Sequence, residues 1–93
     1  MIVGTVELEL MLPGAHSLKE KRAVLNRLKD RVRARFNASV AETEHMELWQ
    51  RARIGVAIAG HEGSGLRDLL EAVRRQVEQD DRIVVLDSVI DIR

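Results

Sequence analysis

Hydrophobic and polar side chains alternate over residues 2–12, and this alternation marks the first predicted element. One side of the segment carries Ile2, Val6, Leu8, Leu10 and Leu12, and the other carries Val3, Thr5, Glu7, Glu9 and Met11. A period of two residues predicts a β-strand with one buried face. Pro13 and Gly14 end the strand, because proline cannot donate to a sheet and glycine accepts turn conformations.

The period changes to that of a helix over residues 17–36. The apolar residues lie three, four and seven positions apart and share one helical face: Leu18, Val24, Leu25, Leu28, Val32 and Phe36. Ser17 and Glu20 match a capping box, in which Ser17 accepts from the backbone three residues on and Glu20 reaches back to the cap. Lys21 falls on the apolar face, and we expect its long side chain to extend the ammonium group to water.

The rest of the chain adds three strands and a second helix. The pattern predicts a short strand at 38–44, a turn at 45–48, a strand at 49–60, a loop at 60–65 (GHEGSG), a helix at 65–79 and a strand at 83–92. The inward residues of the 49–60 strand are Ala52, Ile54, Val56 and Ile58. The helix at 65–79 has one stripe of Leu66, Leu69, Leu70, Val73 and Val77. In the final strand the alternation breaks near Asp87 and Ser88.

The element order β-α-β-β-α-β predicts one domain over residues 1–93 with an α+β, ferredoxin-like fold. In this fold a four-stranded antiparallel sheet carries two helices on one face and leaves the other face open. The first and third strands are central and antiparallel, so Glu7 and Glu9 should meet Arg51 and Arg53 on the open face. Opposite charges paired across strands contribute roughly 0.2–1 kcal/mol each, which favours this arrangement.

Composition narrows the class of protein. Of the 93 residues 45% are apolar but only 2% aromatic, so the core must be aliphatic. The chain has no cysteine, which excludes disulfides and thiolate chemistry and fits the cytoplasm. No apolar run reaches the roughly 20 residues that a membrane helix needs. The first twelve residues lack a basic leader and are not typical of a signal peptide.

The helix at 17–36 carries most of the local positive charge of a chain whose net charge is zero. Residues 19–35 contain eight basic and two acidic side chains. We take as candidate nucleic-acid contacts His16, Lys19, Arg22, Lys29 and Arg33, which lie before the helix or along one flank, while Arg27 and Arg31 lie on the other. Basic residues at helical spacing can follow phosphates, but they also occur as a solubilising surface, and both interpretations remain open.

The open sheet face is the second candidate surface. It has none of the exposed aromatic residues on which an RNA-recognition motif stacks bases, which disfavours that mode of binding. The small residues Gly55 and Ala57 would instead allow a second copy to pack there, as a homodimer. The candidate interface residues are Glu7, Glu9, Trp49, Arg51, Arg53 and Ala57. Trp49, at the start of the predicted strand, is either an anchor at the edge of the core or an exposed stacking or interface residue.

No arrangement of residues indicates catalysis, a metal or a cofactor. Residues 42–47 (ETEHME) are interpreted as an acidic hairpin, because His45 has no second histidine at ligand spacing. The GHEGSG loop precedes a helix but lacks the Gly-Lys-Ser/Thr ending of a P-loop and the spacing of a dinucleotide-binding fingerprint. We therefore predict a protein that is not an enzyme.

Four sequence strings resemble the YlxP-like family of small bacterial proteins, a family of unknown function. They are the first strand ending at Pro13 and Gly14, HSLKEKR at 16–22, RFNASVAE at 35–42 and HMELWQRARIGVA at 45–57. The resemblance implies a ferredoxin-like fold, and it assigns no catalytic residue. Family members are often encoded near ribosome maturation and translation-initiation factors, which implies ribosomal RNA or a ribosome-assembly factor as partner. The GHEGSG loop departs from the family pattern, so no role is carried over to it.

These observations give two main hypotheses, with an enzyme that uses His16 or His45 as a third. The first is a non-enzymatic RNA- or ribosome-associated protein that contacts phosphates through the basic helix. The second is a homo-oligomeric regulatory or scaffold domain that pairs through its open sheet face.

Overall fold

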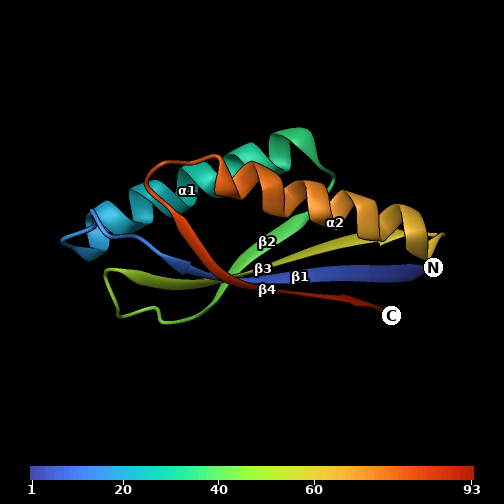
Figure 1. Ribbon diagram of the computed structural model, residues 1–93, viewed down its shortest axis with the longest axis horizontal. Coiled ribbons are helices and arrows are strands. Elements are labelled where there is room, and N and C mark those ends of the chain that lie inside the picture. The colour runs from blue at the N-terminus through green and yellow to red at the C-terminus, as the bar shows by residue number, and fades with distance from the viewer.

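A computed structural model describes residues 1–93 and shows one antiparallel sheet with two helices on the same face (Figure 1). The elements are β1 (Ile2–Met11), α1 (Leu18–Arg35), β2 (Ser39–Glu44), β3 (Arg51–Gly60), α2 (Gly63–Glu78) and β4 (Val84–Ile92). The strand order is β2-β3-β1-β4, with every neighbouring pair antiparallel. The predicted ferredoxin-like α+β fold is confirmed.

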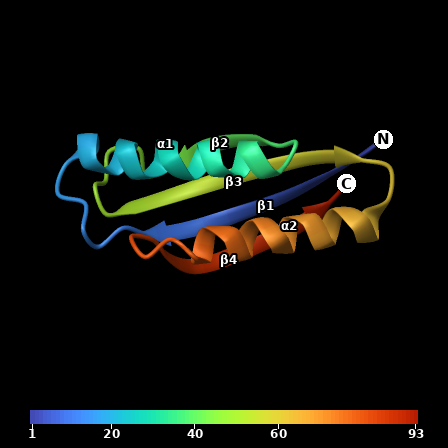
Figure 2. The same ribbon diagram turned by 90° about the horizontal axis from the view of Figure 1, so that it is seen from above.

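The apolar faces of the strands and of the helices pack together in one aliphatic core. Alternate residues of β1 and β3 face the helices and are buried: Val6, Leu8, Leu10, Ala52, Ile54, Val56 and Ile58. The buried stripe of α2 consists of Leu66, Leu70, Val73 and Val77. The buried stripe of α1 repeats the same spacing with Lys21, Leu25, Leu28 and Val32. The core therefore lies between one face of the sheet and the two helices, and Figure 2 shows both helices over that face.

Helix α2 approaches the sheet closely because two glycines lie beneath it. A Cβ atom on Gly4 of β1 would lie 2.8 Å from Leu70 Cδ1, and one on Gly60 of β3 would lie 3.0 Å from Leu66 Cδ2. Both distances are shorter than ordinary packing permits. A larger residue at either position would therefore force the Leu66 or Leu70 side chain to shift.

Two predicted boundaries differ from the structure by two residues, and one residue predicted on a buried stripe is exposed. Strand β3 begins at Arg51, so the predicted start at residue 49 is wrong, and α2 begins at Gly63 within the predicted GHEGSG loop. Leu69 is 43% exposed and not part of the buried stripe, because it lies at the edge of the helical face that meets the sheet. The break predicted near Asp87 is confirmed as a bulge: Glu9 pairs with Asp87 and Leu10 with Val85, which leaves Leu86 as the extra residue.

A buried carboxylate ties the end of α2 to the chain around it. Asp80 is 9% exposed and accepts from the backbone N–H and the guanidinium of Arg82, at 2.8 to 3.0 Å. Arg31 of α1 lies 3.6 Å from the same carboxylate. The hydrogen bond from the Arg82 side chain is the largest of the effects that lower the pKa of Asp80; burial opposes it and is outweighed.

We predict that Asp80→Asn lowers the free energy of unfolding at pH 7 by about 1–3 kcal/mol, because an uncharged amide loses these charge-assisted bonds. The pKa of Asp80 is lower in the folded chain than its unfolded value of 3.8. Its contribution is therefore complete above that pH and is lost as pH falls through the folded pKa. Urea unfolding of parent and variant should show a gap at pH 7 that narrows below about pH 4.

Asp81→Asn serves as the matched control, since Asp81 is exposed and has no ion pair within 4.0 Å. Equal urea midpoints for parent and Asp80→Asn at pH 7 would contradict this account of the α2 terminus.

Candidate nucleic-acid interface

Two hydrogen bonds between side chain and backbone cap the N-terminus of α1. Ser17 Oγ accepts from the backbone N–H of Glu20 at 3.0 Å, as predicted. The Glu20 carboxylate accepts from the backbone N–H of His16 at 2.6 Å, one residue earlier than the predicted cap position. This pair of bonds fixes the direction in which the chain enters the helix and holds exposed His16 at its start.

Lys21 is buried, and the prediction that its ammonium group reaches water is wrong. The side chain is 1% exposed, and its Nζ donates to the backbone carbonyl of His45 at 2.6 Å and lies 2.8 Å from Glu42 Oε2. The contact with Glu42 is an ion pair without the alignment of a hydrogen bond, since Glu42 Oε2 has no hydrogen-bond partner. A carboxylate from β2 and a carbonyl from the following loop thus replace the water that the ammonium group loses.

The sequence does contain a signal for this burial. Lys21 precedes Leu25, Leu28 and Val32 by four, seven and eleven residues, which is the spacing of the buried stripe in α2. A lysine at this position of the helical repeat packs its aliphatic stem in the core, and an acidic residue in a neighbouring strand can pair with its ammonium group.

The other basic residues of α1 have no carboxylate within 4.0 Å, apart from Arg31 beside Asp80. These free cations of α1 are Lys19, Arg22, Arg27, Lys29, Arg33 and Arg35. The only other lysines or arginines without a carboxylate within 4.0 Å are Arg67 and Arg75 of α2. All the unpaired lysines and arginines therefore lie in the two helices. Positive charge left without a partner therefore gathers on α1.

The predicted phosphate contacts are distributed along this helix. Lys19 and Arg22 are exposed in its first turns, close in the chain to His16, and Lys29 is half-buried farther along. Arg33 is exposed, yet one of its guanidinium nitrogens donates to the carbonyl of Val40 in β2 at 3.1 Å. Arg22 and Arg33 are separated by roughly 16 Å of helix. The free cations thus form an extended row rather than a pocket.

The predicted charge pairs on the open sheet face are confirmed. Arg53 donates to Glu7 at 2.7 Å and to Glu9 at 3.2 Å, and Arg51 donates to Glu9. Although burial raises the pKa of Glu9, the hydrogen bonds from Arg51 and Arg53 and the charge of His45 outweigh it and lower the pKa. These arginines are neutralised within the chain, so the centre of the open face offers little net charge to a partner.

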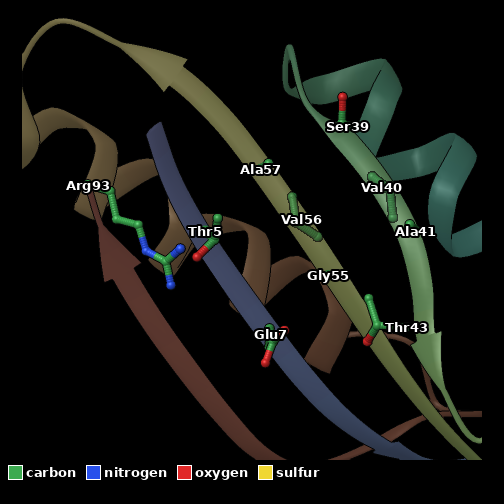
Figure 3. Close-up of a pocket in the computed structure, with 10 residues that line it drawn as sticks. All are labelled: Thr5, Glu7, Ser39, Val40, Ala41, Thr43, Gly55, Val56, Ala57 and Arg93. Carbon is green, nitrogen blue, oxygen red and sulfur yellow. The ribbon is translucent and has the colours of Figure 1, made fainter. Parts of the chain in front are cut away.

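Beside this network the open face is hollowed into a shallow trough of about 360 Å³ (Figure 3). Its floor is made of small residues, Gly55 and Ala57 of β3 and Ala41 of β2. In Figure 3 Thr5 and Glu7 rise from β1 on one side, and the side chain of Arg93 reaches toward Thr5. Ala57 therefore lies on an accessible surface, as the interface hypothesis requires.

Trp49 lies in the loop between β2 and β3 and is 51% exposed, so it does not begin the strand and is not a buried anchor. Gln50 keeps the register of β1 and β3, because its backbone carbonyl accepts from the backbone N–H of Leu12 at 2.9 Å. The Leu12 carbonyl accepts instead from the N–H of Ala15, so the ladder ends at this pair, and the Gln50 side-chain amide donates to the carbonyls of Pro13 and Ala15.

Three possible metal ligands converge at His45. Its ring and the carboxylates of Glu9 and Glu44 place ligand atoms within 4.8 Å of one another, and His45 Nε2 lies 2.9 Å from Glu9 Oε2. The predicted acidic hairpin did not include Glu9, which comes from a strand distant in sequence. Arg51 and Arg53 already occupy the Glu9 carboxylate, so a cation here would compete with two guanidinium groups, and we assign no metal to this cluster.

Neither helix is long and apolar enough to cross a membrane.

The sequence is similar to proteins whose function is not known. The family described as "Protein of unknown function (DUF503)" matches residues 3–90. The uncharacterized protein YlxP of Bacillus subtilis (strain 168) is 45% identical over 56 residues, which are 60% of this chain and 61% of that protein. The match thus spans less than two thirds of that relative's length. Both results agree with the resemblance to YlxP-like proteins noted from residues 16–22 and 45–57.

Among solved structures the de novo designed protein Ferredog-Diesel is similar to this chain. The two share 15% sequence identity with a TM-score of 0.47, over 98% of this chain and 83% of the designed one.

We predict that Lys21→Ala lowers the free energy of unfolding by about 3–5 kcal/mol, because Glu42 then remains in a part-buried site without its cation. Urea unfolding at pH 7 measures the change. Lys19→Ala, two residues away and exposed, is the matched control and should shift stability by no more than about 0.5 kcal/mol. If both variants unfold at the same urea concentration, the buried ion pair does not have the role assigned to it here.

Proposed function

This chain belongs to the DUF503 family of proteins of unknown function, and we propose that it is a non-enzymatic RNA-binding protein that contacts phosphates through α1. Its expected partner is ribosomal RNA, in the cytoplasm, with direct binding to a ribosome-assembly factor as the related possibility. The single observation that carries this proposal is the set of free cations of α1, which have no carboxylate partner in the chain.

A row of cations on a rigid helix suits a phosphate backbone for electrostatic reasons. Each phosphate contact releases condensed counterions, so affinity grows with the number of contacts and falls steeply with salt. Such contacts carry little sequence information. The zero net charge of the chain limits indiscriminate attraction to nucleic acid, while the local surplus on α1 supplies a defined contact surface.

The arginines elsewhere support the choice of α1 over the sheet. Arg51 and Arg53 are engaged with Glu7 and Glu9, and an RNA phosphate would have to displace those carboxylates. No such competition exists at Lys19 or Arg22.

A second candidate function is self-association through the open sheet face. The trough floored by Ala41, Gly55 and Ala57 supports it, since small residues permit close packing of a second copy. The edge strand β4 also exposes apolar Val84 and Val89, at 41% and 51%. Because the charges on this face are already paired within the chain, two copies related by a two-fold axis would not bring unpaired like charges together there.

We predict that the double variant Arg22→Glu, Lys29→Glu weakens RNA binding and its salt dependence. The log–log slope of affinity against salt is roughly −0.7 per phosphate contact for single strands, so losing two contacts should reduce its magnitude by about 1.4. Fluorescence anisotropy with a labelled single-stranded RNA, from about 50 to 200 mM salt, measures both quantities.

Arg67→Glu, Arg75→Glu on α2 is the matched control, because it likewise reverses two helix cations without carboxylate partners and lowers the net charge by the same four units. It should retain most of the parent affinity. Absence of RNA binding at low salt, or equal weakening by both double variants, would rule out α1 as the specific contact.

For the second candidate we predict that Ala57→Arg converts a dimer to a monomer, since an arginine would fill the trough and introduce an uncompensated charge. Light scattering across a concentration series measures the oligomeric state. Ala34→Arg on the exposed side of α1 is the control and should leave a sheet-face dimer intact. A parent that remains monomeric at high concentration would exclude this function.

A further inference from the structure

We propose that Trp49 stacks against an unpaired base of an RNA strand whose phosphates lie on α1, so that the protein prefers single-stranded to duplex RNA. This inference rests on the proposed function and deepens it, because it names the class of RNA and a residue that would read it.

Trp49 presents a free aromatic surface. Its side chain is 51% exposed, and its indole nitrogen makes no hydrogen bond within the chain. Met46 and Leu48 of the same loop are also about half exposed. Beside them lies a shallow, open hollow of about 480 Å³. Its lining residues are His16, Glu47, Leu48, Trp49, Gln50 and Arg51.

The loop that presents Trp49 is held at both ends. At one end the carbonyl of His45 accepts from buried Lys21 at 2.6 Å, and the backbone of Leu48 donates back to the same carbonyl at 3.0 Å. At the other end Gln50 is bonded to Pro13 and Ala15. A ring presented by a fixed backbone loses less conformational freedom on binding, which favours a recognition role over incidental exposure.

Within the lining Arg51 is paired with Glu9, so the charge that favours a nucleic acid comes from the start of α1. His16 forms part of the lining and directly precedes α1, whose first free cations are Lys19 and Arg22. Figures 1 and 2 both show the loop before α1 and the loop between β2 and β3 at the same end of the molecule, away from the termini. Glu47 is the one acidic residue in the lining, and it is exposed.

An aromatic ring beside a row of cations is the combination that single-strand-binding proteins use, because stacking is tolerant of base identity and cations hold the backbone. Bases within a duplex are stacked on their neighbours and unavailable to Trp49, whereas bases in loops and single strands are free to leave the stack. Stacking therefore predicts a preference that phosphate contacts alone do not produce.

The chain contains one tryptophan and no tyrosine, so its intrinsic fluorescence reports on this site alone. The test titrates the full chain with a labelled 12-nucleotide single-stranded RNA of mixed sequence and with the corresponding duplex. Binding is followed by anisotropy of the RNA, and stacking by quenching of Trp49. We expect quenching that follows the binding curve for the single strand, and duplex binding without quenching.

Trp49→Ala should weaken single-strand binding by about 5- to 150-fold and duplex binding by less than about twofold, whereas Trp49→Phe should keep most of the affinity because it keeps a ring. Both variants should fold, since the side chain is half exposed. Because the phenylalanine variant preserves the apolar contacts of the loop, a common loss of single-strand affinity in both variants would indicate loop disruption and overturn the stacking role.

The experiment distinguishes a failure of the stacking site from a failure of the proposed phosphate contact. RNA binding by α1 without Trp49 quenching, and unchanged in Trp49→Ala, would overturn the stacking site and leave the phosphate contact in place. Absence of binding to either RNA would overturn both. If Trp49→Ala keeps full RNA affinity but loses a protein that the parent captures from nuclease-treated lysate, the site is a protein interface instead.

Discussion

A single lysine withdrawn from water connects the two parts of the molecule on which its proposed function depends. Removing an ammonium group from solvent is costly, and the cost is offset here by the Glu42 carboxylate and the His45 carbonyl. Lys21 belongs to α1, Glu42 to β2 and His45 to the loop before β3. The ion pair therefore sets how α1 lies over the edge of the sheet, and it anchors the loop that carries Trp49 beside the start of that helix.

The distribution of the other charges follows from what surrounds them. On the open sheet face the register of β1 and β3 brings arginines within reach of glutamates, and the charges cancel locally. On the outer side of α1 the cations outnumber the two acidic residues of the helix, Glu20 and Asp30, and six of them have no carboxylate within 4.0 Å. Although the net charge of the chain is zero, the open sheet face is nearly neutral and α1 is cationic. This separation is the physical basis for preferring α1 as the contact with an anionic partner.

Much of the fold and part of the candidate site could be predicted from local patterns. The alternation in β1 and β3 placed Glu7 and Glu9 opposite Arg51 and Arg53, and the structure contains those ion pairs. The positions of Lys19 and Arg22 on the exposed side of α1 follow from helical spacing alone. Arg33 could not be assessed in this way, because its bond to the carbonyl of Val40 depends on how β2 packs against the helix.

What the sequence by itself determined is the order of elements, their buried faces and the surplus of positive charge on one helix, because periodicity and charge are properties of neighbouring residues. Tertiary structure alone decided that Lys21 is buried and that Trp49 is exposed. Both depend on partners distant in the chain: Glu42 and His45 for the lysine, and for Trp49 the segment around Pro13, where the β1–β3 ladder ends and the Gln50 side chain is bonded. Local sequence patterns do not reveal such contacts, because these segments meet only in the folded chain.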